Sequence, residues 1–361
     1  MEIIKWGQWI GELQGDNSGT LIMNIDQDTP NNGVICFSDS NENLSSFNGS
    51  IEFTEKPEKC VASVTSLSPL NRPQNVTEVV PQLVELTVQT KLPKKIHGQW
   101  SADNGQRGEF TLHLLESRQP SVWSKSIAWS EFIDISLEAK RKNKSLVFRG
   151  QADSQWTLRT SFHRTNRRDL SSFSAKDMFE LSKYLTLSGN RKFDLSNATD
   201  FAELLSLAQH HGYPTPLLDW SKSPFVAAYF AFRTVKRDDL SGSVRIYFFD
   251  YKKWEKYGQK YRSLSIDDPR FSVTTLDINS QSNSRVLPQQ SLFTFTNLTD
   301  IETWITGHET EGCEFMKAYD ISKKSAHDAM NDLDNMNINA ASLFPGLDGS
   351  FEALKRRLFQ I

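Results

Sequence analysis

One short stretch of the sequence concentrates side chains that bind anions. The segment LVFRGQADSQWTLRTSFHR, residues 146–164, places Arg149 directly after an apolar run typical of a β-strand, and Gln151, Trp156 and Arg159 follow within ten residues. A cation at the end of a half-buried strand is costly unless an anionic group accompanies it. The segment therefore predicts either a bound anionic ligand or an internal carboxylate beside the arginine.

Two later segments also mix polar residues into apolar runs. The first, AQHHGYPTPLLDWSKSPFVAAYFAF, begins at Ala208, and the second, RVLPQQSLFTF, begins at Arg285. In the first, Ser223 followed by Pro224 predicts a helix start, because serine caps helices and proline fits the first helical position. The three segments together supply the amides, the histidine and the carboxylate of a candidate cleft.

Each candidate residue also has a structural alternative. Arg149 fits an interior arginine paired with Asp219, which would fix the strand end. Asp219 itself fits a turn that precedes a helix start, and His210 fits a helix cap. Gln289, at a predicted strand position, can orient a ligand or satisfy backbone groups, and Trp220 fits the core better than a stacking role.

Common motifs for other chemistries do not occur in the sequence. There is no GxGxxG or Walker loop for a nucleotide, and no GxSxG elbow of a serine hydrolase. No HxxxH or CxxC pair occurs, and His210 and His211 are adjacent rather than one helical turn apart. We therefore predict no metal site.

The elements before the first segment predict an all-β domain. Up to about residue 118, short alternating runs are separated by Asn, Gly, Asp and Ser, which is typical of antiparallel strands. Two pieces, GQWIGELQGDNSGTLIMNI from Gly7 and GQWSADNGQRGEFTLHL from Gly98, have the same hairpin pattern. We expect them to be the first and last hairpins of a small closed barrel or sandwich, lying side by side. The alternative is two hairpins that are merely alike.

The elements after residue 118 predict an α+β domain over 119–361. Apolar residues recur at helical spacing from Ile127 to Leu137, and this helix leads into the strand that holds Arg149. Further helices are predicted in SAKDMFELSKYLTLSG, ATDFAELLSLAQHHG, SPFVAAYFAFRTVKR and the tail, and a strand in GSVRIYFFDYKKW. The polar stretch from Ser263 to Ser284 predicts a long loop.

Composition narrows the class of protein. The 361 residues include 41 Lys and Arg against 44 Asp and Glu, so the whole chain has no electrostatic footprint for nucleic acid. The longest apolar run, from Pro224 to Phe232, is about half of a membrane-spanning helix, and no signal peptide is recognisable. Three widely spaced cysteines favour a reducing compartment, so a cytoplasmic protein without a membrane partner is expected.

Several spaced motifs give the second half a family resemblance. Over about residues 125–355 the chain resembles the FRG domain family, named for its Phe-Arg-Gly triplet. The matching residues are Phe148, Arg149, Gly150, Gln209, His210, Gly212, Pro214, Thr215, Leu217, Leu218, Asp219, Trp220, Ser223, Pro224, Ala228, Phe230, Ala231, Arg285, Gln289 and Phe293, with LFPGLDG from Leu343. Two departures are Pro216, where the family usually has arginine, and Gln290-Ser291, where it has a residue and glycine.

The order of these motifs is similar to that of ADP-ribosyltransferases. The resemblance implies a split antiparallel sheet with helices, which holds NAD as the substrate. Arg149 would bind the pyrophosphate or a ribose, and Gln289 occupies the place where such transferases normally use a glutamate. Glu309 and Glu311 form an ExE triplet of the kind that arises by chance.

The resemblance assigns roles to twelve residues. The expected catalytic residues are Arg149, His210, Asp219 and Gln289. The expected cofactor-binding residues are Phe148, Gly150, Gln151, Tyr213, Thr215, Trp220, Ser221 and Ser223.

The function implied is NAD-dependent ADP-ribosyl transfer or NAD cleavage, in an intracellular toxin or anti-phage effector. A protein or nucleic acid would accept the ADP-ribosyl group, and the β domain would recognise a partner or phage component. Two alternatives stay open. The cleft would bind a nucleotide or nucleic-acid fragment without chemistry, or the chain would be a protein-interaction module.

Overall fold

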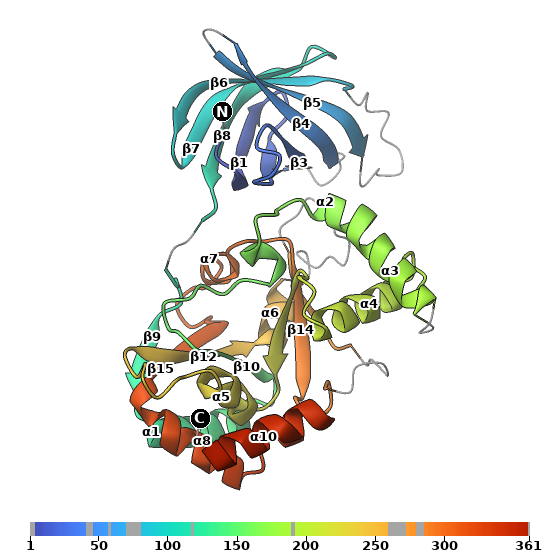
Figure 1. The fold of residues 1–361 in the computed structure, drawn as a ribbon. Coiled ribbons are helices and arrows are strands. Elements are labelled where there is room, and N and C mark those ends of the chain that lie inside the picture. Colours follow the sequence, from blue (N-terminus) through green and yellow to red (C-terminus); the bar gives the residue numbers. More distant parts are fainter. Residues whose placement is uncertain are drawn as a thin grey trace.

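The chain folds into an N-terminal β-barrel and a larger α+β region that follows it (Figure 1). The computed structural model describes residues 4–40, 46–56, 59–69, 81–116, 119–188, 192–258, 272–278 and 285–359. The predicted fold class, an all-β barrel or sandwich followed by an α+β region, is confirmed, and the first part is a barrel. No helix within the described residues has the length and apolar character to cross a membrane.

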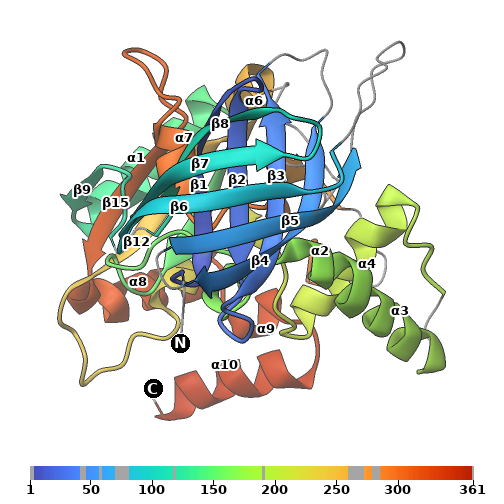
Figure 2. The ribbon, with the colours of Figure 1, turned by 90° about the horizontal axis from the view of Figure 1, so that it is seen from above.

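The barrel is closed by eight antiparallel strands (Figure 2). They are β1 (Gly7–Gly15), β2 (Gly19–Ile25), β3 (Asn32–Asp39), β4 (Phe47–Lys56), β5 (Lys59–Pro69), β6 (Val84–Leu92), β7 (Lys95–Ala102) and β8 (Arg107–Leu114). Each strand pairs with the next, and β1 pairs with β8 through the register Trp9↔Leu114. The two GQW pieces are therefore the first and last hairpins and lie side by side, as predicted. Closure leaves no edge strand in the barrel.

The core of the barrel is formed by every second side chain of its strands. Trp9 and Leu13 of β1, Trp100 of β7 and Phe110 of β8 all belong to one buried cluster inside the barrel. Because successive side chains of a strand point to opposite faces, the residues between them lie on the outside. Many of these outer residues are exposed, but Gln8 on β1 and Ile22 and Asn24 on β2 are buried.

The second sheet has seven strands in the order β13-β14-β11-β10-β12-β15-β9. Their bounds are β9 (Ser124–Ile127), β10 (Leu146–Gln151), β11 (Leu217–Ser221), β12 (Ser243–Asp250), β13 (Val273–Leu276), β14 (Ser291–Thr296) and β15 (Met316–Ser322). All neighbours are antiparallel except β15 and β9, which are parallel. Strand β13 lies inside the stretch predicted as a loop, so that prediction is wrong there, and much of the remaining stretch lies outside the described residues.

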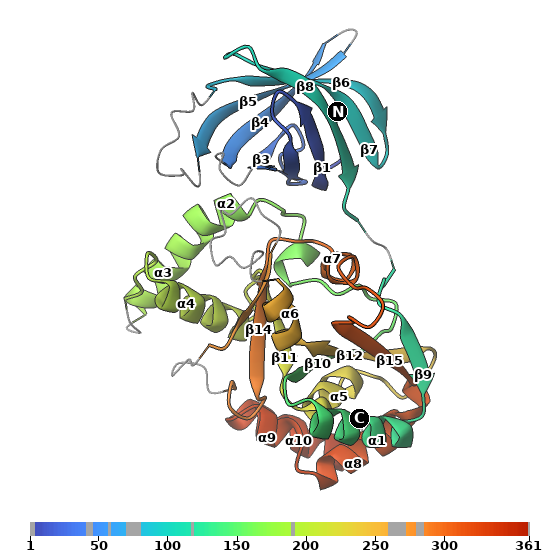
Figure 3. The same ribbon diagram turned by 180° about the vertical axis from the view of Figure 1, so that it is seen from behind.

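This sheet is split between its two central strands. β10 pairs with β12 over six positions, whereas β10 and β11 pair at one position, Phe148↔Ser221. The half formed by β13, β14 and β11 consequently diverges from the half formed by β10, β12, β15 and β9, and Figure 3 shows β11 and β14 running across the direction of β12 and β15.

Helices cover both faces of the split sheet. They are α1 (Trp129–Lys142), α2 (Leu170–Ser172), α3 (Met178–Leu187), α4 (Ala198–His210), α5 (Pro224–Phe232), α6 (Tyr251–Tyr257), α7 (Ile301–Thr306), α8 (Ala326–Asn335), α9 (Ala340–Leu343) and α10 (Leu347–Phe359). Helices α1, α5, α8 and α9 share one buried cluster with Phe148 and Phe248. Helices α6 and α7 share another with Val147 and Trp220 on the opposite face.

Polar and apolar contacts join the barrel to the α+β region. The amide of Gln8 on β1 donates to the Asn297 carbonyl at 2.8 Å and accepts from the Thr299 backbone N–H at 3.0 Å. After β2, the Asp26 carboxylate accepts from the backbone N–H groups of Arg168 and Asp169. Ile22, on the outer face of β2, belongs to the buried cluster of helices α6 and α7. The two parts therefore share buried surface.

Candidate functional site

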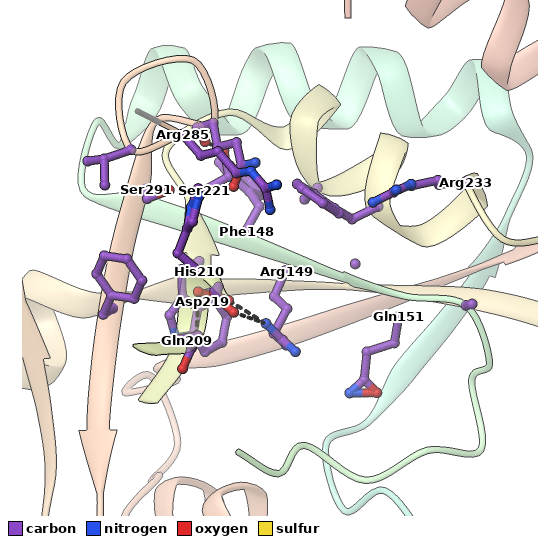
Figure 4. A pocket seen from close by; sticks show the side chains of 18 of the residues that line it. Phe148, Arg149, Gln151, Gln209, His210, Asp219, Ser221, Arg233, Arg285 and Ser291 are labelled. Carbon is purple, nitrogen blue, oxygen red and sulfur yellow. Dashed lines mark hydrogen bonds and ion pairs between the residues drawn. The ribbon is translucent and has the colours of Figure 1, made fainter. Parts of the chain in front are cut away.

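A cavity of about 420 Å³ lies where the second sheet splits (Figure 4). Strands β10 and β11, the end of α4, helix α5 and the turn before β14 contribute its walls. It is lined by nine of the twelve residues that the sequence suggested: Phe148, Arg149, Gly150, Gln151, His210, Asp219, Trp220, Ser221 and Gln289. The volume falls within the range of small-molecule pockets.

Arg149 is held on β10 at the wall of the cavity. Its Nη1 donates to the backbone carbonyl of Asp219 at 2.7 Å and lies 3.8 Å from the Asp219 carboxylate. The side chain is 17% exposed, and its Nε has no hydrogen-bond partner among the described residues. Burial lowers the pKa of Arg149 to about 10, which Asp219 partly offsets and Arg164 reinforces. The guanidinium still carries its charge at neutral pH, so the cavity wall is cationic.

Asp219 lies on β11, opposite Arg149. The sequence alternative placed it in a turn, and this is wrong, because it is the middle residue of a five-residue strand. Its carboxylate accepts a hydrogen bond from Gln209 Nε2 at 2.6 Å, and Gln209 in turn accepts one from the Thr215 hydroxyl. The side chain is 54% exposed. The chain from Thr215 through Gln209 therefore orients a carboxylate that stays accessible to a ligand.

Three more arginines extend the positive wall. Arg164 is the last residue of a short 3₁₀ helix (Phe162–Arg164), Arg233 follows α5, and Arg285 begins the turn before β14. Arg233 is already engaged, since its guanidinium makes two hydrogen bonds with Glu352 at 2.7 and 2.8 Å. The Arg285 guanidinium stacks on the Phe344 ring at 5.0 Å. Four arginines face one carboxylate, that of Asp219, among the described lining residues.

Comparison with protein families identifies the segment that forms much of this cavity. The model of the FRG domain matches residues 144–240. The chain contains an FRG domain. The match is shorter than the stretch of resemblance seen in the sequence, since it includes Arg149, His210 and Asp219 but ends before Arg285 and Gln289.

Comparisons with whole proteins identify no further family relationship beyond the FRG domain. No curated protein matches the chain. Among solved structures, a de novo designed fluorescence-activating β-barrel aligns over 31% of this chain and 95% of its own length, at 17% identity and with a TM-score of 0.23. The FRG domain is therefore the part for which a family relationship is established.

Gly150 of the FRG triplet lets α5 pack on β10. A Cβ atom at this position would lie 2.0 Å from the Ala227 carbonyl oxygen and 2.8 Å from the Ala231 nitrogen. No side chain fits there without moving helix or strand. Gly150 borders the cavity, but its geometry indicates a packing role in the FRG domain.

Gln289 lies outside the matched FRG segment and is held by backbone groups. It was predicted on a strand, and this is wrong, because it lies in the turn directly before β14. Its side-chain Nε2 donates to the Leu343 backbone carbonyl at 3.1 Å, and its backbone carbonyl accepts from the Ser221 hydroxyl at 2.8 Å. These bonds fit the structural alternative, in which the amide satisfies backbone groups.

Three of the predicted cofactor-binding residues of the FRG domain do not line the cavity. The Tyr213 hydroxyl donates to Asp177 at 2.8 Å. Thr215 is buried behind Gln209, and Ser223 caps α5 by accepting from the Val226 backbone N–H. Of the predicted aromatic residues, Trp220 lines the cavity but is 2% exposed and donates to Thr294.

Neither Arg233 nor Arg285 of the FRG-like stretch was predicted from the sequence to contact a ligand. An arginine that directly follows the apolar helix PFVAAYFAF is the signal that marks Arg233. Trp156, which is 53% exposed, is an aromatic side chain on the cavity wall. Among the described residues, no group of three His, Cys, Asp or Glu side chains is placed to hold a metal ion.

Proposed function

We propose that the cavity binds NAD and that its residues cleave the bond between nicotinamide and ribose, with transfer of the ADP-ribosyl group. The observation that carries this proposal is the cationic wall around one accessible carboxylate at the split of the sheet. A dinucleotide matches this wall, because its pyrophosphate carries two negative charges next to riboses with several hydroxyl groups.

The arginines would bind the pyrophosphate. Arg149 and Arg285 flank the cavity with forked donors, and such guanidinium groups make paired hydrogen bonds to phosphate oxygens. Arg164 adds charge at the same wall. Arg233 would contribute less to binding of the pyrophosphate, because two of its N–H donors already bond to Glu352.

Asp219 would stabilise the reacting ribose. As the glycosidic bond breaks, its electron pair leaves with the ring nitrogen as neutral nicotinamide, and positive charge develops on the ribose. A fixed carboxylate beside that charge lowers the barrier. An oxygen nucleophile then bonds to the ribose carbon and loses its proton, for which His210, at the end of α4 on the same wall, is the candidate acceptor.

A second candidate function is nucleotide binding without chemistry. Two observations favour it. The amide of Gln289, which stands where transferases use glutamate, is bonded to Leu343. Glu309 of the ExE triplet accepts from the backbone of Phe315 and Met316 and does not line the described cavity.

The cellular role forms part of the proposal and rests on family resemblance. The protein would act in the cytoplasm as a toxin or anti-phage effector that modifies a protein or nucleic acid. Its barrel would bind the partner or phage component that brings it to its target. Without a catalytic activity, the same two parts would serve as a protein-interaction module.

The test is NAD turnover by the full chain. NAD labelled in the ADP-ribose part is incubated with the protein and cell lysate, and free nicotinamide and labelled macromolecules are measured. We expect Asp219→Asn to reduce nicotinamide release about 100-fold and Arg149→Ala to abolish it. The control is Arg141→Ala, an exposed arginine on α1 outside the cavity, matched for charge and for folding by circular dichroism.

The outcomes separate the candidates. Release that depends on both residues supports cleavage, and the labelled class of macromolecule identifies the acceptor. Binding of NAD without release supports the second candidate. No release and no NAD-induced shift of the melting temperature would contradict both.

A further inference from the structure

One buried amide in the cavity has no partner. Gln151, the last residue of β10, lines the cavity and is 4% exposed. Neither its Nε2 nor its Oε1 has a hydrogen-bond partner among the described residues. Buried polar side-chain atoms are nearly always paired, so such an amide requires an explanation.

The strand fixes the position of this amide. Gln151 is two residues from Arg149, so the two side chains leave β10 on the same face, as Figure 4 shows. The ladder to β12 continues to the end of the strand through the register Gln151↔Arg245. Arg149 Nε on the same face also lacks a partner among the described residues. This face of β10 therefore presents two kinds of donor, Arg149 Nε and Gln151 Nε2, and one acceptor, Gln151 Oε1, to the cavity.

The charged residue opposite Gln151 is engaged elsewhere. The Arg245 guanidinium makes two hydrogen bonds with Asp320, at 2.7 and 2.8 Å, and one with Ser124 at 2.8 Å. These bonds use its Nε and Nη2, while its Nη1, like both polar atoms of the Gln151 amide, has no hydrogen-bond partner among the described residues. Arg245 is therefore held by Asp320 and Ser124 and leaves the Gln151 amide unpaired.

A primary amide is complementary to another primary amide. Each group donates one N–H to the carbonyl oxygen of the other, which gives a pair of parallel hydrogen bonds. Nicotinamide carries such a group on its ring. Along the strand, Gln151 lies about 7 Å from Arg149, which leaves room for one ribose between a phosphate on the arginine and the ring at the amide.

We infer that Gln151 pairs with the carboxamide of nicotinamide and selects NAD over dinucleotides whose ring carries a carboxylate. This inference rests on the proposed function. A carboxylate offers no donor to Gln151 Oε1, so that oxygen would be left unpaired against two negative oxygens. A site built to bond one polar group rejects analogues that lack it.

The experiment compares three ligands on the full chain by titration calorimetry. They are NAD, its nicotinic acid analogue, and ADP-ribose, which has no ring at this end. The wild type is expected to bind NAD at least tenfold more tightly than the acid analogue. Gln151→Leu should remove this preference and weaken NAD binding about tenfold, while the affinity for ADP-ribose stays unchanged.

The matched control is Gln155→Leu, an exposed glutamine four residues further on that does not line the cavity. It should leave all three affinities unchanged. Because leucine removes an unpaired buried amide, the Gln151→Leu protein is expected to fold with an unchanged or higher melting temperature. Gln151→Met, of similar length, makes the same test if leucine does not fit.

Each result has a distinct meaning. An equal loss of NAD and ADP-ribose binding in Gln151→Leu would overturn the inference, since glutamine also pairs with adenine and would then hold that base. Preference for NAD that survives Gln151→Leu would overturn it as well. If the wild type binds neither NAD nor ADP-ribose, the proposed function itself fails.

Discussion

The barrel and the split sheet use β-strands in opposite ways. In the barrel every strand is paired on both sides, and the interior is filled by apolar side chains such as Trp9 and Phe110. The cavity that remains at one mouth is about 70 Å³ and lined almost wholly by apolar residues. In the α+β region the ladder breaks between β10 and β11, and the cavity there is about 420 Å³ and cationic.

This difference explains where polar chemistry can be placed. A closed ladder of eight strands leaves an interior just wide enough for side chains, so charged groups would be buried without partners. A split ladder leaves strand residues such as Arg149 and Asp219 facing each other across a gap that a ligand can enter. Substitutions in the two regions probe this contrast.

The largest effect is expected from filling the contact between β10 and α5. Gly150→Val places a side chain within 2.0 Å of the Ala227 carbonyl, and we expect a loss of about 3 kcal/mol or more in the free energy of unfolding. The barrel comparison is Gly105→Ala, where φ is +91° and nothing lies within 4 Å. There only backbone strain of about 1 kcal/mol is expected. Urea denaturation measures both, and equal losses would contradict the packing role.

The second effect tests the cationic wall. Arg149→Lys keeps the charge but loses the forked donor, so ADP-ribose affinity should fall about tenfold to 100-fold, equivalent to about 1.4–2.7 kcal/mol. Arg107→Lys on the exposed surface of the barrel is the matched control and should leave the affinity unchanged. Titration calorimetry measures the ADP-ribose affinity of both variants. Full affinity in Arg149→Lys would show that a positive charge without the forked donor is enough for binding.

The third effect is a pH dependence of stability from the α+β region. His163 is buried, and burial, with Arg168 and Arg159 nearby, lowers its pKa well below the usual 6.5. Below pH 6.5 the unfolded chain therefore binds a proton that the folded chain does not. Its contribution to stability is present above pH 6.5 and is lost at about 1.4 kcal/mol per pH unit as the pH falls.

Denaturation curves between pH 7 and 5 measure this slope. His163→Gln removes the titrating group, so its slope should be smaller by the same amount. The neighbouring Thr160 hydroxyl, 2.7 Å from Nδ1, can bond to either side chain. Identical slopes in the two proteins would rule out the burial of a neutral His163 as the cause.

The smallest effect is expected at the contact between the two parts. Burial raises the pKa of Asp26 above its usual value, although the backbone N–H groups of Arg168 and Asp169 oppose the shift. A raised carboxyl pKa means that stability is present at low pH and is lost as the pH rises through the folded pKa. Asp26→Asn keeps an acceptor oxygen without the charge.

We therefore expect Asp26→Asn to be more stable than the wild type at pH 7 by less than about 1 kcal/mol, with the difference shrinking towards pH 4. Melting temperatures at both pH values measure it. A variant that is less stable at pH 7 would show that the attraction of Arg167, whose Nε lies 3.9 Å from the carboxylate, outweighs the burial of the charge.

Local patterns predicted the fold well. Alternation and the two GQW hairpins predicted the barrel, because its inner and outer residues repeat every two positions. The helix at Pro224 was predicted from Ser223 and Pro224, whose capping geometry is local. The strand β13 was missed, because its residues VTTL stand within a polar stretch of sequence and, among the described residues, pair with the distant β14.

The candidate site was predicted in part. Arg149 and Asp219 lie together, as their charges suggested. The alternative that put Asp219 in a turn was wrong, since five residues between Pro216 and Lys222 give a weak strand signal until β14 pairs with them. Arg233 lines the cavity next to α5, which packs closely on β10 at Gly150. The local sequence marks an arginine after an apolar helix, but it does not show which strand that helix packs against. The unpaired Gln151 amide is a property of the folded cavity alone.

The outer face of β2 has a consequence for how the molecule unfolds. Ile22 of the barrel and Trp220 of the cavity wall belong to one buried cluster, so neither part can melt without exposing apolar surface of the other. Heating should therefore give one calorimetric transition whose measured and van't Hoff enthalpies agree. An α+β region cut away from the barrel would present that uncovered apolar patch to solvent, which favours aggregation over a soluble fragment.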